Sequence, residues 1–63
     1  TKRELLYSLM VARASLIELE TQWRIAHEIG YVIRDDAVRV DGQIESIFAL
    51  LSGLIRSVRE KDA

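Results

Sequence analysis

The chain has 63 residues, of which 49% are hydrophobic and 30% charged, and it carries a net charge of -1 at pH 7. This length fits one domain or part of one, and the apolar content excludes a disordered chain. Cysteine and proline are absent, which excludes disulfides and thiolate metal sites and favours long uninterrupted helices.

The beginning of the sequence lacks the features of a secreted or membrane protein. Residues Thr1 to Glu4 turn amphipathic too early for a signal peptide. No apolar run approaches the roughly 18 residues of a membrane span. We therefore expect a cytoplasmic protein with no membrane partner.

Residues 2–29 are predicted to form the first helix. Apolar side chains recur there at steps of four and three, so they fall on one side of a helix that turns every 3.6 residues. Flanking apolar residues widen this face beyond what a two-stranded coiled coil needs. The main stripe consists of Leu5, Leu9, Ala12, Leu16, Leu19, Trp23 and Ala26, and the flanking stripe of Leu6, Met10 and Ile17.

The first helix is predicted to end at Gly30, which adopts the left-handed conformation without a Cβ penalty. Residues 30–34 then form a short connection, whose length suits an antiparallel helical hairpin. The second helix is predicted over residues 35–60, with Asp35 or Asp36 as its cap. Its main stripe consists of Ala37, Val40, Ile44, Ile47, Leu51, Leu54 and Val58, with Phe48 and Ile55 beside it.

Two glycines lie inside the second helix, and each costs roughly 1 kcal/mol relative to alanine. The stripe keeps its register across Gly42, so one continuous helix is favoured over a break into two. Gly53 follows Ala49 by four residues. This spacing either lets a neighbouring backbone approach closely or leaves the glycine facing solvent.

A hairpin of two helices can bury only one face of each helix. Side chains of the flanking stripes would then stay in water, although a fully buried Leu, Ile or Phe contributes roughly 1.5–3 kcal/mol. Below about 70–80 residues a core without disulfides or metal is also marginal. We therefore expect further helices, from other copies of the chain, from a missing N-terminal helical half, or from both. The residues expected in the core or interface are Leu9, Leu16, Leu19, Trp23, Ile44, Ile47, Phe48, Leu51 and Leu54.

No catalytic, cofactor or metal site is predicted. His27 is the only histidine, and it lacks the second ligand of a zinc-protease or di-iron helix motif. Glu18 and Glu20 are two residues apart, so they point in different directions on a helix. No motif places a histidine beside any serine. We expect no cofactor and no enzyme activity.

The arginines and the tryptophan permit a second interpretation, nucleic-acid binding. Arginine suits bidentate phosphate contacts, but here the arginines alternate with acids, which is typical of a solvated helix surface. Trp23 is expected to fill the core with its indole N–H bonded or exposed, since a base-stacking role would need a basic groove around it. The possible nucleic-acid contacts are Arg13, Arg24, Arg56 and Arg59.

Two stretches of the sequence carry a family resemblance. The first is the run Ser15-Leu16-Ile17-Glu18-Leu19-Glu20-Thr21-Gln22, which continues to Ala26, Gly30 and Tyr31. The second is the run Leu51-Ser52-Gly53-Leu54-Ile55-Arg56-Ser57-Val58-Arg59. Together they resemble the last two helices of the bacterial 23S ribosomal RNA intervening-sequence protein family. The resemblance covers nearly this whole chain but only about the C-terminal half of a family member. The family's N-terminal half is absent here, and Val32-Ile33-Arg34 replaces the usual polar start of the last helix.

The resemblance implies an all-α fold, with this hairpin forming half of an up-down left-handed four-helix bundle. It also implies a homo-oligomer, with pentamers among relatives, and a similarity in architecture to the accessory variability proteins of diversity-generating retroelements. The function expected is therefore non-catalytic assembly of a small bacterial bundle protein. The alternative is an RNA- or DNA-binding accessory protein, and fold-level analogy alone does not decide between the two.

Overall fold

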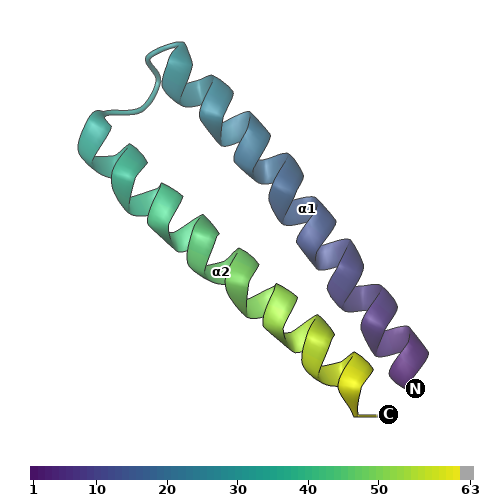
Figure 1. Cartoon of the computed structure of the whole chain (residues 1–63). Coiled ribbons are helices and arrows are strands. Elements are labelled where there is room, and N and C mark those ends of the chain that lie inside the picture. The colour runs from purple at the N-terminus through teal and green to yellow at the C-terminus, as the bar shows by residue number, and fades with distance from the viewer. Residues whose placement is uncertain (62–63) are drawn as a thin grey trace.

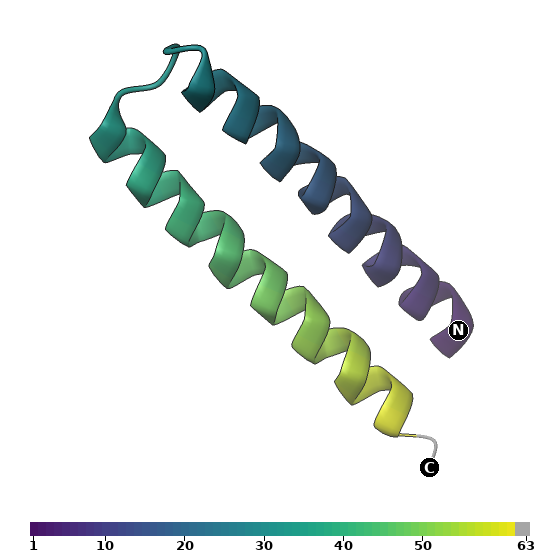
Figure 2. The same ribbon diagram turned by 45° about the horizontal axis from the view of Figure 1, so that its top comes forward.

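The computed structural model describes residues 1–61 as two helices packed in an antiparallel hairpin (Figure 1). Helix α1 spans Lys2–Glu28 and α2 spans Arg34–Glu60, with 27 residues in each. The two helices lie side by side along their length, as the turned view in Figure 2 also shows. The predictions of an all-helical chain and of a helical hairpin are confirmed for residues 1–61. No helix in this range is long and apolar enough to cross a membrane.

A capping box starts α1. The Thr1 hydroxyl oxygen accepts a hydrogen bond from the Glu4 backbone N–H at 3.2 Å, and a Glu4 carboxylate oxygen accepts one from the amino group of Thr1 at 3.3 Å. The pairing satisfies the Glu4 backbone N–H, one of the groups that every helix start leaves free, together with the amino group of Thr1. The Thr-x-x-Glu spacing is the sequence signal for this start, and it is independent of the hydrophobic stripes.

Gly30 ends α1 as predicted, with φ at +84°. The Gly30 N–H donates to the His27 carbonyl and the Tyr31 N–H donates to the Ala26 carbonyl, at 3.1 and 3.0 Å. This pair of bonds is a Schellman motif, which satisfies two carbonyls of the last turn. A residue with a Cβ is strained at this φ, so the hairpin connection depends on glycine here.

The cap predicted for α2 was wrong. The helix begins at Arg34, one residue earlier than expected, with Ile33 as an extended N-cap that forms no side-chain bond. Asp35 and Asp36 lie instead in the first turn, where a carboxylate still interacts favourably with the helix dipole. Asp36 accepts a hydrogen bond from Arg39 at 2.8 Å. The segment Val32 to Arg34 contains no side chain that caps a helix well, so sequence rules favour the acidic pair as the start.

The hairpin core is small. Only Ala37, Ile44 and Ile55 are buried among the described residues, and all three belong to α2. Ile55 belongs to the flanking stripe that was expected to stay in water in a hairpin of two helices, but it is 2% exposed. The α1 residues that pack against α2 are half-buried, and they are Leu6, Leu9, Arg13, Leu16, Trp23 and Ala26.

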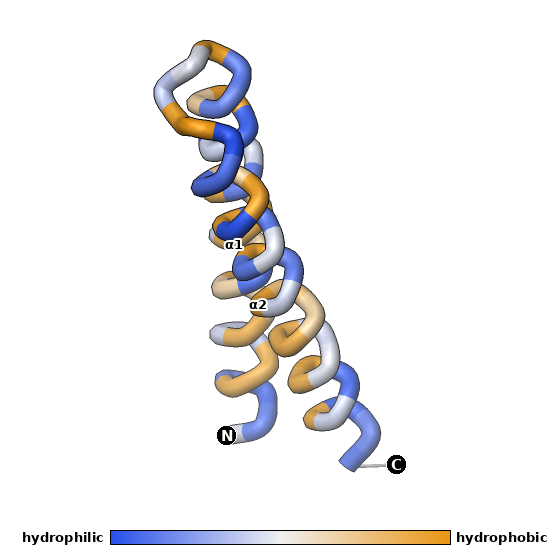
Figure 3. Tube along the Cα trace, turned by 90° about the vertical axis from the view of Figure 1, so that its left-hand side faces the viewer, coloured by the Kyte–Doolittle hydropathy of each residue, from blue (hydrophilic) through white to orange (hydrophobic). Residues whose placement is uncertain are grey.

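The residues of α1 that pack against α2 are therefore shifted by about one position from the predicted main stripe. Leu5, Ala12 and Leu19 belong to that stripe but stay exposed, while Leu6 and Arg13 lie half-buried near α2. Residues seven apart share one side of a helix, so the three exposed residues form one row. Because α2 packs on only one side of the main stripe, the row points past α2 into solvent. Figure 3 shows that hydrophobic and hydrophilic residues alternate at short intervals along both helices.

Gly42 does not interrupt α2, so the prediction of one continuous helix is confirmed. A Cβ added at Gly42 or at Gly53 would meet nothing within 4 Å. The close helix approach considered for Gly53 is therefore absent from the hairpin.

We expect the substitutions Gly42→Ala and Gly53→Ala to raise the free energy of unfolding by about 0.5–1 kcal/mol each, since alanine restricts the unfolded chain and costs no contact. Urea unfolding followed by circular dichroism measures this. A destabilising effect at either position would show that another helix packs against that glycine in solution.

Candidate functional site

The two long sides of the hairpin differ in chemistry. One side, here called the apolar face, consists of Leu5, Ala12 and Leu19 of α1 with Ile47 and Leu54 of α2. The four large side chains are 42–52% exposed. Between the helices on this side lies a shallow groove of about 210 Å³, in which Gln43 is the one polar residue of its lining. The remaining lining residues are Leu16, Leu19, Trp23, Val40, Ile44 and Ile47.

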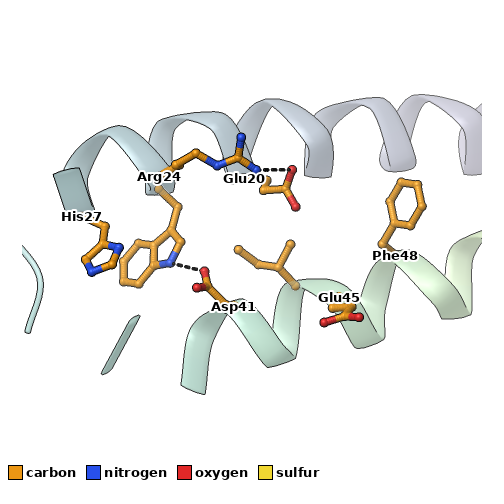
Figure 4. Close-up of a pocket in the computed structure, with 8 residues that line it drawn as sticks. Glu20, Arg24, His27, Asp41, Glu45 and Phe48 are labelled. Carbon is orange, nitrogen blue, oxygen red and sulfur yellow. Dashed lines mark hydrogen bonds and ion pairs between the residues drawn. The ribbon is translucent and has the colours of Figure 1, made fainter. Parts of the chain in front are cut away.

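The opposite side, here called the charged face, carries most of the polar contacts between the helices. Figure 4 shows Glu20, Arg24 and His27 of α1 beside Asp41, Glu45 and Phe48 of α2, around a cleft of about 260 Å³. The face consists of one row on each helix, with members three or four residues apart and therefore on one side. The rows are Met10, Arg13, Ile17, Glu20 and Arg24 on α1, and Asp41, Glu45, Phe48, Ser52, Arg56 and Arg59 on α2.

Near the connection, the charged face is held by an aromatic donor. The Trp23 indole N–H donates to an Asp41 carboxylate oxygen at 2.9 Å, which joins the two helices. The indole N–H is bonded, as expected, whereas the Trp23 side chain is half-buried and lies outside the buried core of Ala37, Ile44 and Ile55. Arg24 and Glu20 form an exposed ion pair at 3.5 Å within α1, of a kind that contributes little to stability.

At the open end of the hairpin, the charged face is held by arginines that bond neutral groups. Arg13 donates to the Ser52 hydroxyl at 3.3 Å, and Arg59 donates to the Met10 sulfur at 3.7 Å. Arg56 lies one turn after Ser52 on the same row. Within residues 1–61, neither Arg13, Arg56 nor Arg59 forms an ion pair with a carboxylate. The positive charges of these arginines are therefore uncompensated within the described hairpin.

Of the four arginines proposed as nucleic-acid contacts, the structure brings three together. Arg13, Arg56 and Arg59 share the open end of the charged face, whereas Arg24 lies toward the connection and pairs with Glu20. Eleven residues separate Arg13 from Arg24, which is about 16 Å along a helix. Sequence spacing alone could not show this grouping, because it depends on which residues of α2 face α1.

The residues predicted for the core or interface occupy three environments. Ile44 is buried, Leu9, Leu16, Trp23 and Leu51 are half-buried between the helices, and the rest are exposed. The exposed residues are Leu19, Ile47, Phe48 and Leu54. Phe48 lies on the charged face, and the other three lie on the apolar face.

No cluster of histidine, aspartate and glutamate in residues 1–61 is arranged to hold a metal ion. His27 is exposed in the last turn of α1. The acids that line the same cleft, Glu20, Asp41 and Glu45, do not converge on one point (Figure 4). The distinctive feature of the molecule is therefore its surface, with one apolar and one charged face.

The hairpin exposes more surface than a compact protein of its mass. Its accessible surface is 5158 Å², against about 4,100 Å² expected for a folded monomer of this mass. The excess of about 1,000 Å² per chain is similar to the roughly 800 Å² that each partner buries in a standard protein interface. The radius of gyration, 14.6 Å, also exceeds the roughly 11 Å of a compact chain of this length.

No model of a known protein family, no curated protein and no solved structure matches this chain. The resemblance to the intervening-sequence family therefore stays a prediction from the residues that carry it.

Proposed function

We propose that this hairpin is a non-catalytic assembly module, half of an up-down four-helix bundle of the kind formed in the 23S ribosomal RNA intervening-sequence family. The helices that complete the bundle pack on the apolar face. They come from further copies of the chain, in a homo-oligomer that reaches a pentamer in the family, or from an N-terminal helical half.

The apolar face is the observation that carries this proposal. Its row Leu5, Ala12 and Leu19 continues the heptad stripe of α1, and Ile47 and Leu54 continue that of α2. A heptad stripe in a bundle points toward the bundle axis, between two neighbouring helices. In the hairpin one of those neighbours is present, so half of each stripe remains in water. An exposed apolar surface of this extent marks a site of protein association.

We expect the purified chain to form a species several times its own mass of 7.2 kDa. Its helix content and its mass should fall together on dilution, because folding and association are then one equilibrium. Light scattering and circular dichroism over a concentration series measure both quantities. A fully helical species of single-chain mass at every concentration would disprove the proposal.

The alternative function, binding of RNA or DNA, is favoured by one observation, the grouping of Arg13, Arg56 and Arg59 without carboxylate partners. Such a binder loses affinity steeply as salt rises, because phosphate contacts release counterions. Titration of a labelled RNA duplex at low and at physiological salt tests the alternative. The absence of binding at low salt would rule it out.

A further inference from the structure

The charges on the charged face are segregated along its length. Toward the connection lie Glu20, Glu45 and Asp41, with Arg24 paired to Glu20. Toward the open end lie Arg13, Arg56 and Arg59. One half of the face is therefore net negative and the other half is positive.

Between the two halves lies an apolar centre. Ile17 and Phe48 line one groove of about 370 Å³ together with Leu16, Glu20 and Ile44. Both side chains are partly in water, with Ile17 48% and Phe48 39% exposed. An apolar centre with charges around it is the usual composition of a protein interface.

The two halves are spaced almost symmetrically about this centre. On α1, Arg13 lies four residues before Ile17 and Glu20 lies three residues after it. On α2, Asp41 lies seven residues before Phe48 and Arg56 lies eight residues after it. Arg13 and Glu20 therefore form one pair about the centre, and Asp41 and Arg56 form the other. At 1.5 Å per residue, the two members of a pair differ by about 1.5 Å in their distance from the centre.

We propose that the charged face binds the charged face of a second copy of this chain, turned end over end about a two-fold axis that crosses the helices at Ile17 and Phe48. In this arrangement α1 lies against the partner's α1 and α2 against its α2. Arg13 then faces the partner's Glu20, and Arg56 faces the partner's Asp41. Because the contact is isologous, each ion pair forms twice.

The arrangement of charges selects this orientation and this kind of partner. A two-fold axis parallel to the helices would place arginine over arginine and acid over acid, which is unfavourable. A nucleic acid would neutralise the arginines but would place its phosphates near Glu20 and Glu45. The second copy instead gives an opposite charge to members of both halves, to Arg13 and Arg56 and to Glu20 and Asp41. The guanidinium of Arg13 keeps donors free beyond its bond to Ser52, and Asp41 keeps a second carboxylate oxygen beyond its bond to Trp23.

This contact goes beyond the proposed function, because it uses the side of the hairpin opposite to the apolar face. Its test uses two charge-reversed variants of the chain. The acidic variant carries Arg13→Glu and the basic variant carries Glu20→Arg. Asp41 and Arg56 are left unchanged, so their pair stays attractive in every combination and Asp41 keeps its bond to Trp23. Arg13 is half-buried and Glu20 is exposed, and circular dichroism verifies that helix content is retained.

We expect each variant alone to associate through this face about 100-fold more weakly than the parent chain at low salt, because like charges then face each other. The mass of each variant in sedimentation equilibrium should fall to that of the oligomer that the apolar face alone holds together. An equal mixture of the two variants recovers the parent mass, because every pair of facing residues at positions 13 and 20 then joins an arginine to a glutamate. The parent loses this association in about 1 M salt, where the Debye length is about 3 Å.

The control is Arg39→Glu, compared with Arg56→Glu alone. It changes the charge of α2 by the same amount but lies outside the charged face. The proposal is wrong if both variants keep the parent mass, if the mixture fails to restore it, or if Arg39→Glu has the same effect as Arg56→Glu. A second result would also contradict the proposal. The parent chain would not associate through the charged face, and the acidic variant would bind a labelled RNA duplex more weakly than the parent does. Loss of the contact through the apolar face reduces helix content, whereas loss of the contact through the charged face lowers only the mass. The two measurements therefore show which of the two contacts has failed.

Discussion

The substitution Leu19→Asp is expected to dissociate and unfold the protein in one step. In the hairpin alone Leu19 is 52% exposed, so an aspartate there would cost little beyond its lower helix propensity, under about 1 kcal/mol. With further helices on the apolar face, the same carboxylate is buried without a partner, which costs several kcal/mol. The two situations differ enough to be separated by a single variant.

Helix content and mass, measured on the same sample by circular dichroism and light scattering, give the result. Ile47→Asp should behave in the same way, because Ile47 lies on the same face of α2. The matched control is Ile25→Asp. Ile25 is also 52% exposed on α1, but its position is on the side of the helix away from α2 and from both faces. If Leu19→Asp and Ile25→Asp both leave mass and helix content unchanged, the apolar face is not an assembly surface.

The substitution Ile55→Ala is expected to have the second largest effect. Ile55 is 2% exposed and is one of three buried residues in the hairpin. Truncation of a buried isoleucine to alanine costs about 2–5 kcal/mol, as lost transfer free energy plus the cavity that remains. A core this small has little else to offset that loss. The urea midpoint of unfolding should therefore fall sharply, or the variant should be unfolded in buffer.

The outcome of Ile55→Ala also tests the hairpin independently of what covers it. The contact between Ile55 and α1 lies inside the hairpin, so the loss should persist at high protein concentration, where association is complete. Ile25→Ala is the matched control, since it removes the same atoms from an exposed site and gains helix propensity. A variant Ile55→Ala as stable as Ile25→Ala would mean that α2 does not pack against α1 through this residue.

The helices and the turn followed directly from local sequence rules. Steps of three and four in the apolar residues define both helices, and Gly30 supplies the left-handed residue that a Schellman motif requires. These features depend on residues within a few positions of each other. Sequence alone therefore predicts them well, apart from the α2 cap at Ile33, which has no side-chain signature.

The division of the surface into two faces could not be predicted in the same way. A heptad stripe shows which side of a helix is apolar, but not where along that side the neighbour packs. Ile55 was expected to need further helices to cover it and is already buried in the hairpin, whereas Leu19, expected in the core or interface, is exposed in the hairpin alone. Both differences arise because α2 packs at the edge of the α1 stripe. Likewise, the Trp23–Asp41 bond joins residues 18 apart, and only the register between the helices brings them together.

The equal lengths of α1 and α2 have a consequence for how such modules can be connected. Because both helices contain 27 residues, the start of α1 and the end of α2 lie at the same end of the rod (Figure 1). A tandem duplication joined by a short flexible loop would thus give a single polypeptide with four helices. The tether would hold the two units at an effective concentration in the millimolar range, so a weak association between separate chains would become a permanent one within a chain.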